Sequence, residues 1–149
     1  MRARQAGFTL IELLVVITLI AIASSVVTLA MRDPAATRLE QEAARLAALL
    51  ESARAESRAA GLQARWEPRG QQADMPGFRF IGFPEGAQLP GHWLGDGVSA
   101  EVVGARAIVL GPEPMIGAQR IVLRLDGQRL VLATDGLGPF TVVGNEVTP

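Results

Sequence analysis

One carboxylate, Glu12, lies in the segment GFTLIEL (residues 7–13), a few residues inside the most apolar run of the chain. A charged side chain in a membrane-spanning helix costs about 2.5–3.5 kcal/mol or more at the bilayer centre, and less near its edge. Such a residue is by default present for a function and has a partner. A stray acid near the membrane edge is the alternative. Glu12 is therefore the first candidate functional residue of this sequence.

The side chains that usually carry catalysis are scarce. The sequence has no cysteine and no tyrosine, and its one histidine, His92, lies in the Pro/Gly-rich segment LPGHWLGDG. Zinc sites of the usual Cys/His kinds are therefore excluded, as is Ser-His or Cys-His catalysis other than through His92. We interpret His92 as a loop side chain beside Trp93. The carboxylates Glu85, Asp96 and Glu101 show no spacing that indicates a catalytic pair, so we expect no enzyme activity and no cofactor.

Metal ions and nucleic acids are not expected as ligands either. Three Asp-Gly pairs, at 96–97, 126–127 and 135–136, could be taken for calcium ligands. No stretch alternates oxygen ligands as a calcium loop does, and Asp-Gly is first of all turn chemistry. The formal net charge is −1. Because a duplex is bound by clustered cations, this charge predicts no nucleic-acid partner.

The first 33 residues have the form of a membrane segment. Arg2 and Arg4 precede an apolar run of about two dozen residues, from Phe8 to Met31, and a bilayer core about 30 Å thick needs about 20 helical residues. The arginines before the run predict a cytoplasmic N-terminus, with the remainder of the chain on the other side. One alternative is a secretory signal peptide cleaved after Ala30, which would release a soluble protein. A plain membrane anchor is another, and neither explains the carboxylate in the run.

The segment GFTLIEL resembles the type IV prepilin signal. In that family a short basic leader ends in glycine, a prepilin peptidase in the membrane cuts after it, and the exposed residue, usually Phe, is N-methylated. The resemblance implies cleavage between Gly7 and Phe8, methylation of Phe8, and Arg2 and Arg4 as the leader charge. It also implies that Glu12 pairs with the new amine of a neighbouring subunit. The carboxylate then penalises an isolated subunit and favours a registered filament.

A second helix is predicted after the apolar run. Asp33 and Pro34 fit an N-cap followed by proline at the first helical position, so the helix breaks or kinks there. Gly61 fits the C-cap. An apolar stripe at 3/4 spacing runs along the helix between these ends. Its members are Leu39, Ala43, Leu46, Leu50, Ala53 and Ala60.

Two pairs of opposite charge lie at i,i+3 on the same helix, Glu42 with Arg45 and Glu51 with Arg54. Pairs at this spacing can stabilise a helix. The stripe is short and rich in alanine for a lone coiled coil. We therefore expect it to pack on a sheet formed by the rest of this chain.

From residue 62 onward the helical period stops, and Gly and Pro interrupt the chain every few residues. We predict strands at about 62–67, 77–83, 98–103, 106–111, 119–125, 128–134 and 139–143. Loop 84–97 carries Trp93 and is a candidate contact surface for a partner. The alternative is that this loop folds Trp93 back onto its own core.

The clearest hairpin is RIVLRLDGQRLVLATDG, with Asp126-Gly127 as its two-residue turn. This turn places Ile121 opposite Leu132 and leaves apolar side chains on both faces. It also sets Arg124 against Arg129, a like-charge pair that is mildly unfavourable. A bulged turn with a shifted register is therefore the alternative. Strands apolar on both faces fit a helix on one side and a second sheet or a partner on the other.

These elements predict an α+β fold that resembles a pilin, with a long N-terminal helix packed on an antiparallel β domain of two sheets. The expected parts are a leader at 1–7, a transmembrane and assembly helix at 8–31, an amphipathic periplasmic helix at 32–61 and a periplasmic β domain at 62–149.

The segment from residue 109 to 142, VLGPEPMIGAQRIVLRLDGQRLVLATDGLGPFTV, looks like the C-terminal part of the H-type minor pseudopilins of type II secretion. In those proteins a Gly/Pro turn precedes a hairpin, and a Gly-rich turn leads to a last strand. Related minor pilins of type IV pili share this domain type, and some bind DNA through a basic C-terminus. The tail TVVGNEVTP has no basic residue, so we do not expect that activity.

The resemblance implies a structural subunit of the bacterial inner membrane that is cut by a prepilin peptidase. With other minor and major pseudopilins and an inner-membrane assembly platform, it would form the tip region of a periplasmic pseudopilus that drives export across the outer membrane. A type IV minor pilin is the alternative. A secreted soluble β-rich binding protein is a further alternative, and an anchored periplasmic enzyme lacks a convergent set of acid, base and nucleophile.

Overall fold

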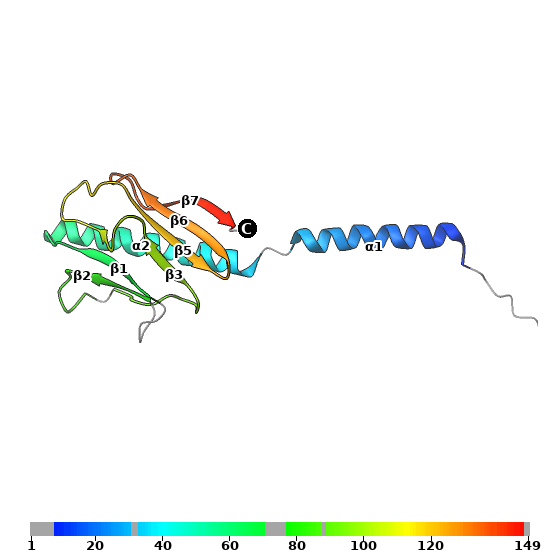
Figure 1. Cartoon of the computed structure of the whole chain (residues 1–149), viewed down its shortest axis with the longest axis horizontal. Coiled ribbons are helices and arrows are strands. Elements are labelled where there is room, and N and C mark those ends of the chain that lie inside the picture. The colour runs from blue at the N-terminus through cyan, green and yellow to red at the C-terminus, as the bar shows by residue number, and fades with distance from the viewer. Residues whose placement is uncertain (1–7, 31–32, 71–76, 88, 148–149) are drawn as a thin grey trace, which may run out of the picture. The chain divides into compact units, whose positions relative to one another are not determined.

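The computed structural model describes residues 8–30, 33–70, 77–87 and 89–147. Its contacts divide the chain into two compact units, Met1–Asp33 and Pro34–Pro149. The first unit contains the helix α1 (Leu10–Ala30), shown in blue in Figure 1. Among the helices that the structure describes, none combines the length and the apolar character needed to cross a membrane. The span expected at 8–31 stays a prediction.

The helix α2 (Pro34–Ala60) begins and ends where the sequence predicts. Pro34 is its first residue. At the other end Gly61 has a φ of 64°, and the N–H of Leu62 donates to the carbonyl of Ser57 at 2.9 Å. This is the hydrogen bond of a Schellman C-cap, which requires the left-handed conformation that glycine adopts without strain.

The apolar stripe of α2 is buried as expected from Leu39 to Ala53. The expectation for Ala60 is wrong, because this residue is exposed in the last turn, beyond Ser57, the last buried residue of the helix. Three polar side chains that were not expected inside are also buried, and each has a partner that offsets the loss of water. They are Glu42, Arg54 and Ser57.

All seven predicted strands are present, within a few residues of the predicted limits. They are β1 (Arg65–Arg69), β2 (Gly77–Ile81), β3 (Ser99–Val102), β4 (Ile108–Val109), β5 (Gln119–Leu125), β6 (Gln128–Thr134) and β7 (Thr141–Val147). They form two antiparallel sheets, one in the order β2-β1-β4 and one in the order β3-β5-β6-β7. Figure 1 shows α2 along the strands, and it contacts β5, β6 and β7. The second unit therefore has the expected α+β fold with two sheets.

The β5–β6 hairpin has the predicted register, with Ile121 opposite Leu132. Asp126 and Gly127 both have positive φ, 47° and 82°, as a two-residue hairpin turn requires. The alternative of a shifted register is therefore wrong for this hairpin. The one irregularity lies between β6 and β7 instead. The facing arginines are partly neutralised, because Arg124 forms an ion pair of 2.9 Å with Glu101 on β3.

The core joins α2 to both sheets. Trp66 of β1 and Phe78 of β2 are fully buried, with ring centroids 5.8 Å apart. The two sheets are also linked by one amide: Gln119 of β5 donates to the carbonyl of Val109 at 2.9 Å, and the N–H of Val109 donates to the Gln119 Oε1 at 2.8 Å. This pair of bonds satisfies the backbone of the short strand β4 where it would otherwise end at an open edge.

Replacing Gly136 with alanine should destabilise the second unit more than replacing Gly117. Both have left-handed φ, 94° and 74°, but an added Cβ at Gly136 would lie 2.6 Å from the Gly117 backbone, whereas one at Gly117 meets nothing within 4 Å. The shared strain costs about 1–2 kcal/mol, and we expect the clash to add about 1–3 kcal/mol. Urea unfolding of each full-length variant in detergent, followed by the fluorescence of Trp66 and Trp93, measures the two losses of stability. Equal losses of stability for the two substitutions would contradict the close contact between Gly136 and the Gly117 backbone.

Candidate functional site

The N-terminal candidate site is built on the first turn of α1. The N–H of Glu12 donates to the carbonyl of Thr9 at 3.1 Å and to its Oγ1 at 3.3 Å. Thr9 is therefore the N-cap, and Glu12 is the third residue of the helix, which is the spacing of a capping box; the structure has the bond to the Thr9 hydroxyl and not the reciprocal one to the Glu12 carboxylate. A carboxylate here is also favoured by the helix dipole. Thr9 is not among the predicted site residues, although the spacing in TLIE is a signal for it.

The Glu12 side chain is exposed, and no hydrogen bond or ion pair joins its carboxylate to another residue in the part of the chain that the structure describes. Phe8, the expected new N-terminus, is also exposed, at 75%. The structure thus places Phe8, Thr9 and Glu12 around one helix start. Arg2, Arg4 and Gly7 lie outside the described residues.

The side chains of α1 described from residue 10 to 24 are all exposed. Most are large and apolar, and an exposed surface of this kind marks a contact with protein or lipid. The large apolar residues are Leu10, Ile11, Leu13, Leu14, Val15, Val16, Ile17, Leu19, Ile20 and Ile22.

Comparison with known families matches residues 2–28 to the prokaryotic N-terminal methylation motif. The chain carries a type IV prepilin-like signal. The match includes Phe8, Thr9 and Glu12 and most of α1, and it ends before the second unit. No curated protein and no solved structure matches the chain. The motif implies processing by a prepilin peptidase and pilin-like partners.

Trp93, the candidate partner contact in loop 84–97, lies in the core. It is 8% exposed, and its ring packs against Phe78 with the centroids 4.8 Å apart. The loop is held from α2, because Glu42 accepts the N–H groups of Leu94 and Gly95 and Arg45 donates to the carbonyl of His92 at 2.9 Å. These bonds hold the loop so that the indole lies in the core. The alternative prediction, that loop 84–97 folds Trp93 back onto its own core, is confirmed. Leu94 of this loop is a large apolar side chain that is 65% exposed.

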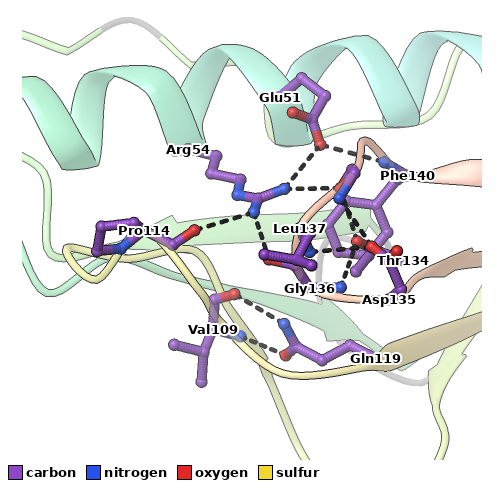
Figure 2. A network of polar contacts seen from close by, with 11 residues as sticks. Glu51, Arg54, Val109, Pro114, Gln119, Thr134, Asp135, Gly136, Leu137 and Phe140 are labelled. Atoms are coloured by element: carbon purple, nitrogen blue, oxygen red, sulfur yellow. Dashed lines mark hydrogen bonds and ion pairs between the residues drawn. The ribbon is translucent and has the colours of Figure 1, made fainter.

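The second half of α2 holds another pair of loops through Arg54 (Figure 2). The Arg54 side chain is 1% exposed. Its Nη1 donates to the carbonyl of Gly138 at 2.9 Å, and its Nη2 donates to Gly136 at 2.7 Å and to Pro114 at 3.4 Å. Glu51 lies 3.7 Å from the guanidinium and accepts the N–H of Phe140 at 3.1 Å. One buried cation therefore binds two loops to the helix.

The predicted i,i+3 pairs are both formed, at 3.9 Å for Glu42–Arg45 and 3.7 Å for Glu51–Arg54. These N–O distances are longer than the hydrogen bonds that the same side chains make to loop backbone. The main partners of both pairs are thus main-chain groups far away in the sequence. Their spacing predicts the pairs but not these partners.

Asp135 shapes the second of the two loops. Its Oδ1 accepts the N–H groups of Leu137 at 2.9 Å and Gly138 at 2.7 Å. These two bonds, the one from Gly138 first, lower the pKa of the Asp135 carboxyl below its ordinary value of 3.8. The Asp135-Gly136 pair is therefore turn chemistry, as expected.

The other carboxylates considered for chemistry do not converge. Glu101 on β3 is bound to Arg124, while Glu85 and Asp96 are exposed residues of the loop between β2 and β3. Across the described ranges, no three Asp, Glu or His side chains gather closely enough to hold a metal ion. The arrangement that the structure does build is a set of polar clamps around α2.

Replacing Arg54 with methionine should lower the free energy of unfolding by about 3–5 kcal/mol, because three carbonyls and Glu51 lose a buried partner. The matched control is Arg58→Met, an exposed arginine one turn further along α2, for which we expect a change within about 0.5 kcal/mol. Urea titration of the full chain in detergent measures both. Similar effects of the two substitutions would show that the clamp contributes little.

Asp135→Asn should change how stability depends on pH. Because the folded pKa is lowered, the ionised carboxyl stabilises the fold above its unfolded pKa. This contribution is lost as the pH falls below about 4 and through the folded pKa. The advantage of the natural protein over the variant in urea midpoint should therefore be present at neutral pH and shrink in acid. A constant difference between these conditions would rule out the charge as its source.

Proposed function

We propose that this chain is a minor pseudopilin of a type II secretion system, a structural subunit at or near the tip of a periplasmic pseudopilus that helps to drive protein export. The observation that carries the proposal is the N-terminal methylation motif at residues 2–28, which contains Glu12 at the start of a helix with an exposed apolar surface. The proposed role is mechanical, with no catalytic residue and no cofactor.

The proposed mechanism starts with removal of residues 1–7 by a prepilin peptidase. Cleavage leaves a positive amine on Phe8, which is then methylated. The Glu12 carboxylate has no partner in the described chain, so it is available to the amine of a neighbouring subunit. In a medium of low dielectric an unpaired charge is strongly unfavourable, and pairing removes this penalty only in the correct register.

The proposed location is the inner membrane, with the N-terminus in the cytoplasm and the second unit in the periplasm. Two features of the sequence support it: the apolar run from Phe8 to Met31, and Arg2 and Arg4 on its N-terminal side. The second unit is compact by itself, as a domain outside the bilayer must be. Between pseudopilus and type IV pilus, the form of residues 109–142 and the absence of basic residues from the tail favour the pseudopilus.

The first test is the mass of the full chain isolated from a host with a prepilin peptidase. We expect a chain that begins at Phe8 and carries one added methyl group, and an unprocessed chain from a host without the peptidase. A soluble chain that begins at Met31 would overturn the proposal and favour a secreted binding protein.

The second test separates the charge of Glu12 from its place in the capping box. Glu12→Gln keeps a residue that suits the third helical position but removes the charge, so we expect normal cleavage and about tenfold less incorporation into filaments, as for a lost pair worth about 1.4 kcal/mol. Thr9→Val removes the cap and keeps the charge, and Glu40→Gln on the exposed face of α2 is the control.

Co-purification of the natural chain with type II secretion subunits or with type IV pilus subunits distinguishes the two assemblies, and the incorporation of Glu12→Gln tests the role of the carboxylate. If Glu12→Gln assembles normally, the carboxylate is not an assembly residue.

A further inference from the structure

The two loops that Arg54 holds present the most exposed large apolar side chains described in the second unit. We call residues 111–118 and 135–140 the Arg54 loops. Met115 in the first is 67% exposed and Leu137 in the second is 68% exposed. Exposed apolar side chains on loops are common singly, but these two lie on loops that touch each other.

The Arg54 loops are held together tightly. Arg54 Nη2 donates to carbonyls of both loops, at Pro114 and at Gly136. The N–H of Ile116 donates to the Gly136 carbonyl at 3.4 Å, and Gly136 lies so close to the Gly117 backbone that a Cβ atom at position 136 would not fit. A surface fixed in this way loses little conformational entropy when it binds, which favours a binding role.

The charge of this surface is acidic. Glu113 and Asp135 are exposed on the two loops, and the sequence has no basic residue at 107–119 or 130–149. Arg54 is buried against carbonyls and Glu51, and Arg58 of α2 lies beside Gly111, at the margin of the first loop. A complementary surface must therefore combine apolar side chains with free cations.

The outer face of the β2-β1-β4 sheet has these properties. Arg65 and Arg69 of β1 are exposed, and neither side chain has a hydrogen bond or ion pair to another residue within the described ranges. Ile81 and Val109 lie opposite Arg65 on the neighbouring strands and are 36% and 39% exposed. Arg79, a further exposed cation on this face, is bound to Glu67 at 2.7 Å, and the exposed Arg106 lies beside this pair.

We propose that the Arg54 loops of one copy dock on the outer face of the β2-β1-β4 sheet of a second copy. Two carboxylates and two apolar side chains on one surface meet two arginines and two apolar side chains on the other. Within one copy both surfaces are exposed to solvent. Their opposite charges and apolar side chains can therefore meet only when one surface of one copy contacts the other surface of a second copy. Because the two surfaces differ, the contact is head-to-tail, and it can be repeated from copy to copy.

This contact lies in the second unit and does not rest on the proposed function. Its small size predicts weak association, which a shared membrane or filament would strengthen by raising the effective concentration. The absence of cysteine from the chain makes cross-linking between introduced cysteines a direct measurement.

The test uses full chains in detergent, each with one introduced cysteine. A mixture of Leu137→Cys and Ile81→Cys should give about tenfold more oxidised dimer than a mixture of Leu137→Cys and Leu94→Cys, because complementary charges favour the first encounter. Leu94 is a matched control, an exposed loop leucine outside both surfaces. Equal yields from the two mixtures would overturn the proposal.

Charge reversal tests the recognition itself. Glu113→Arg on the Leu137→Cys chain, or Arg69→Glu on the Ile81→Cys chain, should each return the yield to that of the control mixture. Combining the two reversed chains should restore it, which also shows that both variants are folded. A yield that does not change on reversal, or is not restored in the combination, would overturn the proposal even if dimers form.

Discussion

Two loops of the second unit, residues 111–118 and 135–140, depend on one buried interaction, that of the Arg54 guanidinium with main-chain carbonyls. A buried cation is strongly unfavourable unless its donors are satisfied, and arginine presents them in a fixed planar geometry. Gly136, Gly138 and Pro114 supply acceptors for the two Nη atoms, and Glu51 supplies the opposite charge, whereas the buried Nε has no hydrogen-bond partner among the described residues. Two loops without regular secondary structure are thereby placed relative to a helix rather than relative to each other alone.

One orientation of α2 both buries its apolar side chains and brings its charged side chains to the loops. Leu46, Leu50 and Ala53 are buried under the sheet, and the rotation of the helix that buries them also turns Arg54 and Glu42 toward the loops. Glu42 then binds the loop that carries Trp93, in the same way as Arg54 binds its two loops. A helix with a narrow stripe of leucine and alanine can therefore hold both the strands and the long loops of a β domain in place.

The two units differ in how many of their apolar side chains are buried and in whether their charged side chains have partners. In the second unit the buried side chains form one core, and its charged pairs are bound to backbone or to each other. In the first, α1 exposes its apolar side chains, and the Glu12 carboxylate has no described partner. The methylation motif matches the first unit. The unit whose apolar and charged side chains lack described partners is thus the unit that carries the methylation motif.

The sequence by itself determined the features that have local causes. The start and end of α2 follow from Pro34 and from the left-handed conformation at Gly61, and the hairpin register follows from Asp126-Gly127. The N-terminal motif is likewise a short pattern of residue types. In each case the physical cause acts within a few residues, through a capping bond, a fixed dihedral angle or a two-residue turn.

Only the tertiary structure decided which polar and loop side chains lie inside, where the buried stripe of α2 stops, and how the strands divide into two sheets. Arg54 binds carbonyls 82 and 84 residues away, Trp93 is drawn inward by bonds from Glu42 to its neighbours, and Ala60 is exposed although it continues the stripe. The burial of a residue depends on which distant segments cover it, and periodicity along one helix does not carry that information.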